Sequence, residues 1–149
     1  MEFNRHISRR LHEEHVATLA LWGRLESALA AGRHDAALLK SAAASLEREL
    51  DRHFRFEEAE LFPRLAEAGE GDIGELLREE HETIRAAGMR FIKLVSSEIA
   101  NPEVKILGLE LAERLVNHVQ KEEMALLPAL DDFIDEETDH ELDSAYAAT

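Results

Sequence analysis

A short histidine-rich unit occurs twice in the chain, and this duplication limits the possible folds more than any other feature. Leu-His-Glu-Glu-His at residues 11–15 returns as Leu-Arg-Glu-Glu-His at residues 77–81. A second motif, His-x-x-x-Glu, begins at His53 and again at His118, and a proline follows ten residues after each of these histidines. Two copies of one unit predict two related structural halves.

The composition favours helices. The 149 residues are enough for one domain with a sizeable core, only 5% of them are aromatic, and glycine and proline are few. Apolar residues recur at helical spacing on the same face as the motif histidines, as Leu46 and Leu50 do before His53. The chain has no cysteine, which excludes disulfides and thiolate metal sites. We therefore predict an all-α fold.

Four segments carry helix start or stop signals. A glycine follows each of the first two segments, and a capping box or an Asn-Pro pair precedes each of the last two. Pro63 and Pro128 should kink or end their helices nearby, because proline removes one backbone hydrogen bond. The signals are Ser8 to Ala31 with Gly32 as a stop, Asp35 as an N-cap with a helix continuing through His53 toward Ala68 and Gly69, Asp72 with Glu75, and Asn101 with Pro102.

Short connections between these helices predict an antiparallel up-down four-helix bundle over residues 1–130, built from two pseudo-symmetric helical hairpins. Residues 131–149 hold eight acidic side chains and no Lys or Arg. We interpret them as an acidic C-terminal tail. A solvated segment is the simplest interpretation, and a segment that binds a partner is the alternative.

The two copies together supply a set of metal ligands. His53 and Glu57 lie one helical turn apart on one face, and the second copy repeats this pair. Nitrogen and carboxylate ligands without thiolate suit iron or manganese, and zinc less specifically. We predict two non-haem iron ions, oxo- or hydroxo-bridged, with both glutamates bridging and one position open on each ion. The predicted ligands are His15, His53, Glu57, His81, His118 and Glu122.

Charged neighbours of these ligands have alternative interpretations. Glu58 and Glu123 follow the ligand glutamates and should turn about 100° from the ligand face, either behind the ligands or to the surface. Glu14 and Glu80 could orient an imidazole through its other ring nitrogen, or lie on solvated faces. The remaining histidines are expected at the surface, and they are His6, His12, His34 and His140. The alternative for His12 is a contact with the rim of the site.

The copies also differ in ways that bear on access to the site. Trp22 corresponds to Gly88, so the glycine either makes room for the indole or leaves a gap beside the metals. Leu19 corresponds to Arg85, which either turns outward or pairs with a core carboxylate.

The six ligands, in this order and spacing, resemble the motif of the hemerythrin-like family, the HHE cation-binding domains, over about residues 8–130. The resemblance implies a four-helix bundle with a di-iron centre and chemistry with dioxygen, nitric oxide, peroxide or iron. Oxygen-carrying members have a further histidine where this chain has Arg85, and a carboxylate spacing that would select Glu123. The chain is more similar to the four-His, two-Glu branch, which includes iron sensors and iron–sulfur repair proteins.

Charge and hydropathy narrow the range of partners. The formal net charge of −15 repels phosphate backbones, so we expect no nucleic-acid binding. No apolar run approaches the roughly 20 residues that span a bilayer, and residues 1–6 do not resemble a signal peptide. We therefore expect no membrane association and a cytoplasmic protein.

We predict a protein that binds or senses dioxygen, nitric oxide or iron. One alternative is a di-iron enzyme acting on peroxide or ferrous iron, and another is a helical interaction domain with a structural metal. A peroxidase would gain from a proton donor, but the single tyrosine, Tyr146, lies in the tail. A sensor would also need a protein partner, which the sequence does not identify.

Overall fold

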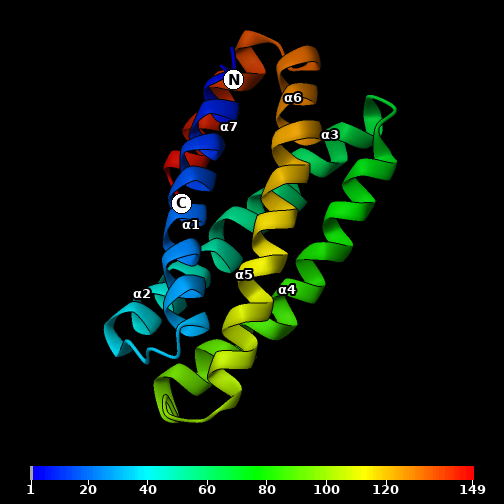
Figure 1. Ribbon diagram of the computed structural model, residues 1–149. Helices are drawn as coiled ribbons and strands as arrows, with labels where there is room; N and C mark the ends of the chain where they lie inside the picture. The colour runs from blue at the N-terminus through cyan, green and yellow to red at the C-terminus, as the bar shows by residue number, and fades with distance from the viewer. Residues whose placement is uncertain (1) are drawn as a thin grey trace.

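The computed structural model describes residues 2–149, which form helices and connecting turns without a strand (Figure 1). These residues make five continuous helical stretches, two of which contain π-helical segments labelled η. The stretches are α1 (His6–Ala30); α2 (Ala36–Arg48) with η1 (Glu49–Phe54), η2 (Glu57–Leu61) and α3 (Phe62–Glu67); α4 (Gly71–Ser97); α5 (Glu103–Lys121) with η3 (Glu122–Leu126) and α6 (Leu127–Phe133); and α7 (Glu136–Ala147).

The first four stretches enclose a common interior. Helix α1 packs against α2 and α5, and α4 packs against the same two helices, so the contacts close a ring. In Figure 1 the chain runs down along α1, up through α2 to α3, down along α4 and up through α5 to α6. The all-α prediction is confirmed. The predicted number of helices was one too few, because α7 forms a fifth stretch alongside α1.

Glycines end the first two stretches as the sequence predicts. Gly32 and Gly69 have φ angles of 74° and 86°, in the left-handed region where a side chain would be strained. Asp35 is the predicted N-cap, since its carboxylate accepts a hydrogen bond from the Leu38 N–H at 3.0 Å.

The last two predicted starts differ in detail. Helix α4 begins at Gly71 without a side-chain cap, so the predicted capping box at Asp72 does not form. Asp72 lies in the first turn instead, where its charge favours the helix dipole. The Asn101 side chain accepts a hydrogen bond from the Glu103 N–H at 2.9 Å, and α5 begins at Glu103.

Neither proline ends its stretch. Pro63 and Pro128 are each preceded by a π-helical segment, η2 and η3, and the chain then continues as α3 and α6. The prolines cannot donate a backbone hydrogen bond, and the wider π turn absorbs this loss without stopping the helix. Both π segments contain a predicted glutamate ligand at their first residue.

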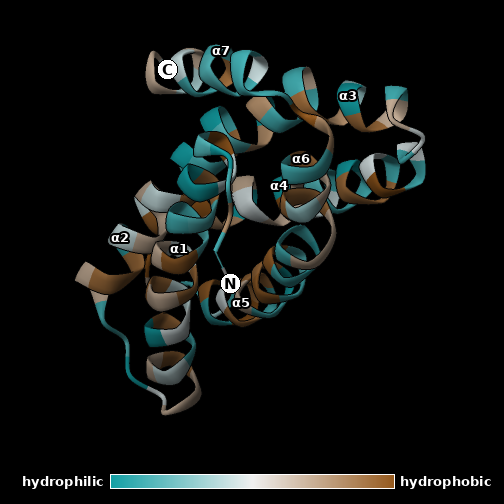
Figure 2. Ribbon diagram, turned by 90° about the horizontal axis from the view of Figure 1, so that it is seen from above, coloured by the Kyte–Doolittle hydropathy of each residue, from teal (hydrophilic) through white to brown (hydrophobic). Residues whose placement is uncertain are grey.

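The interior has a polar layer between two apolar clusters. One cluster contains Trp22 and Phe91, and the other contains Leu11 and Phe62. In Figure 2, brown hydrophobic segments alternate with teal hydrophilic ones along the helices, as expected of helices with one buried face. Each fully buried leucine or phenylalanine contributes roughly 1.5–3 kcal/mol to folding, whereas buried polar groups cost stability unless they are paired. Burial of the two apolar clusters therefore offsets the cost of burying the polar layer between them.

Both interpretations of Gly88 are wrong. A Cβ atom at this position would lie 3.0 Å from Leu46 Cδ2 and 3.3 Å from Leu50 Cδ1. The glycine thus makes room for two leucines of the second stretch, not for Trp22, whose ring packs on Phe91 at a centroid distance of 5.6 Å. No gap beside the predicted ligands results.

The acidic C-terminal residues form a packed helix, so the expectation of a solvated segment is wrong. Leu142 and Tyr146 of α7 are buried against the second apolar cluster. The buried Asp139 carboxylate accepts hydrogen bonds from the His6 and Ile7 N–H groups, both at 2.9 Å. An acidic side chain there caps the otherwise unpaired first turn of α1. Among residues 2–149, no helix is long and apolar enough to cross a membrane.

Candidate metal centre

The six side chains predicted as ligands converge in the polar layer, where each is at most 2% exposed. Their donor atoms form two groups, and within each group the atoms lie within 4.8 Å of one another. Both groups contain Glu57 and Glu122. One group adds His15 and His53, and the other adds His81 and His118.

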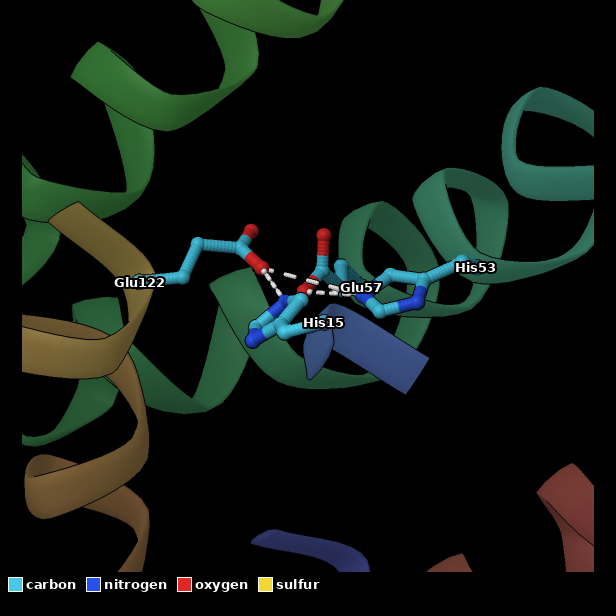
Figure 3. Close-up of side chains that lie close together, drawn as sticks. All are labelled: His15, His53, Glu57 and Glu122. Carbon is cyan, nitrogen blue, oxygen red and sulfur yellow. Dashed lines mark hydrogen bonds and ion pairs between the residues drawn. The ribbon is translucent and has the colours of Figure 1, made fainter. Parts of the chain in front are cut away.

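Figure 3 shows the first group, which joins α1, the second stretch and η3. His15 Nε2 lies 2.8 Å from Glu122 Oε1, and His53 Nε2 lies 3.0 Å from Glu57 Oε2. His53 Nε2 also lies 3.7 Å from Glu122 Oε1. The two imidazoles thus point their Nε2 atoms toward the two carboxylates.

The second group repeats this arrangement from α4 and α5. His81 Nε2 lies 3.1 Å from Glu57 Oε1, and His118 Nε2 lies 3.1 Å from Glu122 Oε2. The two Nε2 atoms are themselves 3.1 Å apart. Glu57 therefore faces the first group with Oε2 and the second group with Oε1. Glu122 faces the first group with Oε1 and the second group with Oε2.

A second set of carboxylates lies behind the histidines, on their Nδ1 side. Each ring can donate its Nδ1–H outward, which leaves the Nε2 lone pair facing inward, as metal-binding imidazoles require. The orienting interpretation of Glu14 and Glu80 is therefore supported, and Glu58 and Glu123 lie behind the ligands. The pairs are His15 with Glu123 at 2.7 Å, His53 with Glu14 at 3.1 Å, His81 with Glu58 at 2.7 Å, and His118 with Glu80 at 2.8 Å.

The electrostatics of this layer favour a bound cation. Burial alone would lower the pKa of His15 and of His118, but the adjacent carboxylates raise these pKa values to about 9 and about 10. Burial would raise the pKa of Glu122, but His118 and the other imidazoles hold it well below its usual range. Glu122 is thus ionised and needs positive charge beside it, from protonated imidazoles or from a bound cation.

Two buried carboxylate oxygens in this layer have no hydrogen-bond partner among residues 2–149. Glu57 Oε1 and Glu122 Oε2 are buried and accept no hydrogen bond of good geometry, although imidazole nitrogens lie 3.1 Å away. Buried oxygens without a partner are costly. A cation held between the imidazoles and carboxylates would satisfy both, so the donor set fits a metal.

Sequence reasoning missed two residues of the His53 surroundings. Glu49 is buried, and its carboxylate lies 3.3 Å from His53 Nδ1. It precedes His53 by four residues, so helical spacing could have found it. Tyr146 donates a hydrogen bond to Glu14 at 2.6 Å, and no local pattern predicts that contact.

Besides Arg52, whose Nη1 lies 3.4 Å from Glu14 Oε2, three further basic side chains contact the outer carboxylates. His12 Nδ1 lies 2.5 Å from Glu123, so His12 touches the rim of the site. Arg85 donates to Glu58 at 3.0 Å, and this partner is one of the outer carboxylates rather than a core ligand. The third pair joins Lys121 to Glu80.

An all-α chain with histidines and glutamates converging from four helical stretches defines a class of helical metal-binding proteins. The model of the hemerythrin HHE cation-binding domain matches residues 6–130, and the chain belongs to this family. Searches of curated proteins and of solved structures found no match to the chain.

Proposed function

We propose that the protein holds two non-haem iron ions in this layer, within the four-helix bundle that the ring of α1, α2, α4 and α5 would form. The observation that carries the proposal is the composition of the two ligand groups. Each has two imidazoles of its own, and both share Glu57 and Glu122. Two carboxylates common to two groups suit a pair of ions, because each oxygen of a carboxylate can bind a different ion.

The ligand chemistry favours iron over the alternatives. Imidazole and carboxylate donors without thiolate suit iron and manganese, and zinc less specifically. Family membership supports a bound cation, since the matching domain is described as cation-binding. Four protein groups per ion leave a coordination position for a small ligand, and such an ion can bind dioxygen, nitric oxide or peroxide.

We propose binding or sensing of such a ligand, or of iron, as the role of the centre. Among residues 2–149, the Nε2 atoms make polar contacts only with one another and with Glu57 and Glu122, and the Phe54 ring stacks on His81 at a centroid distance of 3.7 Å. No proton donor outside this set faces the Nε2 atoms among the contacts of residues 2–149. A small neutral ligand could bind there without an acid to cleave it.

The alternative is an enzyme acting on peroxide or ferrous iron, and one observation favours it. Tyr146 lies closer to the centre than its place in the sequence suggests, through its bond to Glu14. However, Glu14 contacts the Nδ1 side of His53, so the imidazole separates the hydroxyl from the proposed metal positions. This geometry supports binding over peroxide cleavage.

Metal analysis tests the proposal directly. The protein, produced with iron in excess, should contain close to two iron ions per chain, and azide, nitric oxide or peroxide should alter the optical spectrum of the iron. A spectral change in proportion to the protein supports binding or sensing, whereas peroxide loss over many turnovers supports the enzyme. One zinc per chain with negligible iron would refute the di-iron centre and leave a structural metal.

A further inference from the structure

Helix α7 reaches the proposed metal centre through the hydroxyl of Tyr146, and Arg52 forms a longer link, with its Nη1 3.4 Å from Glu14 Oε2 and its Nη2 3.1 Å from the Tyr146 carbonyl. The Tyr146 hydroxyl donates to Glu14 Oε1 at 2.6 Å, and the same oxygen lies 3.1 Å from His53 Nδ1. A single carboxylate oxygen therefore joins a residue of α7 to a proposed metal ligand. Because His53 Nε2 faces Glu57 on the opposite side of the ring, these contacts set the orientation of the imidazole.

Tyr146 is held firmly in place. Its side chain is fully buried, and its ring packs against Phe56 at a centroid distance of 4.7 Å. The Arg52 guanidinium lies 4.1 Å from the ring centroid, and its Nη2 donates to the Tyr146 carbonyl at 3.1 Å. A tyrosine fixed by these contacts can fix Glu14 in turn.

The other polar contacts between α7 and α1 stay away from the centre. Asp139 caps the first turn of α1, and Asp143 pairs with Arg10 at 2.7 Å near the surface. Tyr146 is one turn further along α7, and its partner Glu14 immediately precedes His15. Docking of α7 thus has a part that is independent of the metal site and a part that depends on it.

Among residues 2–149, no residue outside the first four stretches contacts the outer carboxylates of the second half, Glu58 and Glu80. Glu80, which corresponds to Glu14, pairs with Lys121, whose side chain is 47% exposed. Lys121 lies in α5, the same helix as His118. The tie to a further helix is specific to His53.

We propose that Tyr146 is a positioning residue for His53, and that docking of α7 and metal binding at the centre therefore strengthen each other. The inference rests on the proposed function. A metal on Nε2 keeps the Nδ1–H directed at Glu14 and so keeps Glu14 in place for Tyr146. Linkage requires the reverse effect to be equal, so docked α7 raises the affinity for the metal by the same factor.

Amide hydrogen exchange measures this coupling. Iron(II), added without oxygen, should slow exchange of the α7 amides at least about fivefold relative to the metal-free protein, the lower end of typical coupling between sites. Tyr146→Phe keeps the buried ring and removes the hydroxyl. In this variant the effect of iron on α7 should be largely lost, because only the longer link through Arg52 remains, and the affinity for iron should fall by nearly the factor that the wild type showed in exchange.

Asp143→Asn is the matched control, because it loosens α7 without touching Glu14. It should speed exchange of α7 with and without iron and leave the ratio of the two rates unchanged. Amides of α2 between Leu39 and Ala43 report any global effect of metal removal. An iron effect on α7 that persists in Tyr146→Phe, or that vanishes equally in Asp143→Asn, overturns the inference. A protein that takes up no iron overturns the proposed function as well.

Discussion

The two halves of the proposed metal centre share Glu57 and Glu122 but differ in what surrounds them. In each half, the lone histidine and the histidine of the His-x-x-x-Glu motif direct Nε2 toward the two shared glutamates. The Nδ1 atom of each histidine lies within hydrogen-bond distance of an outer carboxylate. The carboxylates correspond as well, Glu14 with Glu80 and Glu58 with Glu123. Duplication of the sequence therefore extends beyond the ligands to the groups that orient them.

The difference lies one contact further out. Behind His53 lie the buried Glu49 and a tyrosine from α7, whereas the residue that corresponds to Glu49 in the second copy is Arg114, which pairs with Glu110 on the surface. Behind His81 and His118 lie the partly exposed cations of Arg85 and Lys121. One half is enclosed by another helix, whereas the other is bordered by the partly exposed side chains of Arg85 and Lys121. Two nearly identical sets of proposed ligands thus have unequal environments.

Removal of a shared ligand should have the largest effect. Glu57→Ala or Glu122→Ala takes a carboxylate from both ligand groups at once, so we expect loss of most of the iron from both halves. Glu58→Ala and Glu123→Ala remove only an outer carboxylate and should weaken iron binding about 10–100-fold. The iron content after dialysis measures the difference. If Glu123→Ala loses its iron and Glu122→Ala retains it, the fourth-stretch ligand is wrongly assigned.

Metal removal should have the next largest effect, with opposite pH trends in the two forms. In the metal-free protein, the raised pKa values of His15 and His118, about 9 and about 10, give stability that is complete below the unfolded pKa of about 6.5. This stability is lost as the pH rises through 9 to 10. Iron requires neutral imidazoles, so its affinity rises with pH.

The melting temperature at pH values between about 6 and 10, with and without iron, checks this prediction. The loaded form should be the more stable one, because binding energy adds to folding energy, and the gap should widen with pH. His15 and His118 belong to different halves, so both halves should contribute. Equal melting temperatures of the two forms at all pH values would contradict the prediction.

Arg85→Leu should have the smallest effect and makes the halves more alike, since leucine is the corresponding residue in the first copy. The lost ion pair with Glu58 is partly exposed, and such pairs contribute roughly 0–1 kcal/mol. Urea denaturation should show a change within that range. Glu58 still accepts from His81, so iron content should stay near the wild-type value. Complete loss of iron would show that Arg85 holds the second half together.

Local patterns in the sequence predicted which six side chains converge and most helix ends. The spacing of His53 and Glu57 puts both side chains on one helix face whatever the rest of the fold does, and the structure brings all six predicted side chains together. Gly32, Gly69 and Asp35 act on their own backbone neighbourhood and were interpreted correctly. These features depend on residues within about one helical turn.

Apart from the capping box at Asp72, the predictions that failed depended on distant neighbours. The space at Gly88 is filled by leucines of the second stretch, and nothing near Gly88 in the sequence indicates that. The expectation of a solvated tail weighed charge alone, whereas α7 buries Leu142 and uses Asp139 to cap α1. A helix of mostly polar residues can dock through a few specific contacts. The hydrogen bond between Ile7 and Asp139 is such a contact, and it joins residues more than 130 positions apart in the sequence.

The sequence by itself therefore determined which residues can act as ligands, because helical periodicity and duplication are properties of the chain. Only the tertiary structure decided how the two halves differ. The pairing of Tyr146 with Glu14, and of Arg85 with Glu58, joins residues from separate stretches, and such pairs are chosen by packing. Side chains one contact beyond the ligands are set by the neighbouring helix, whose position depends on the whole core.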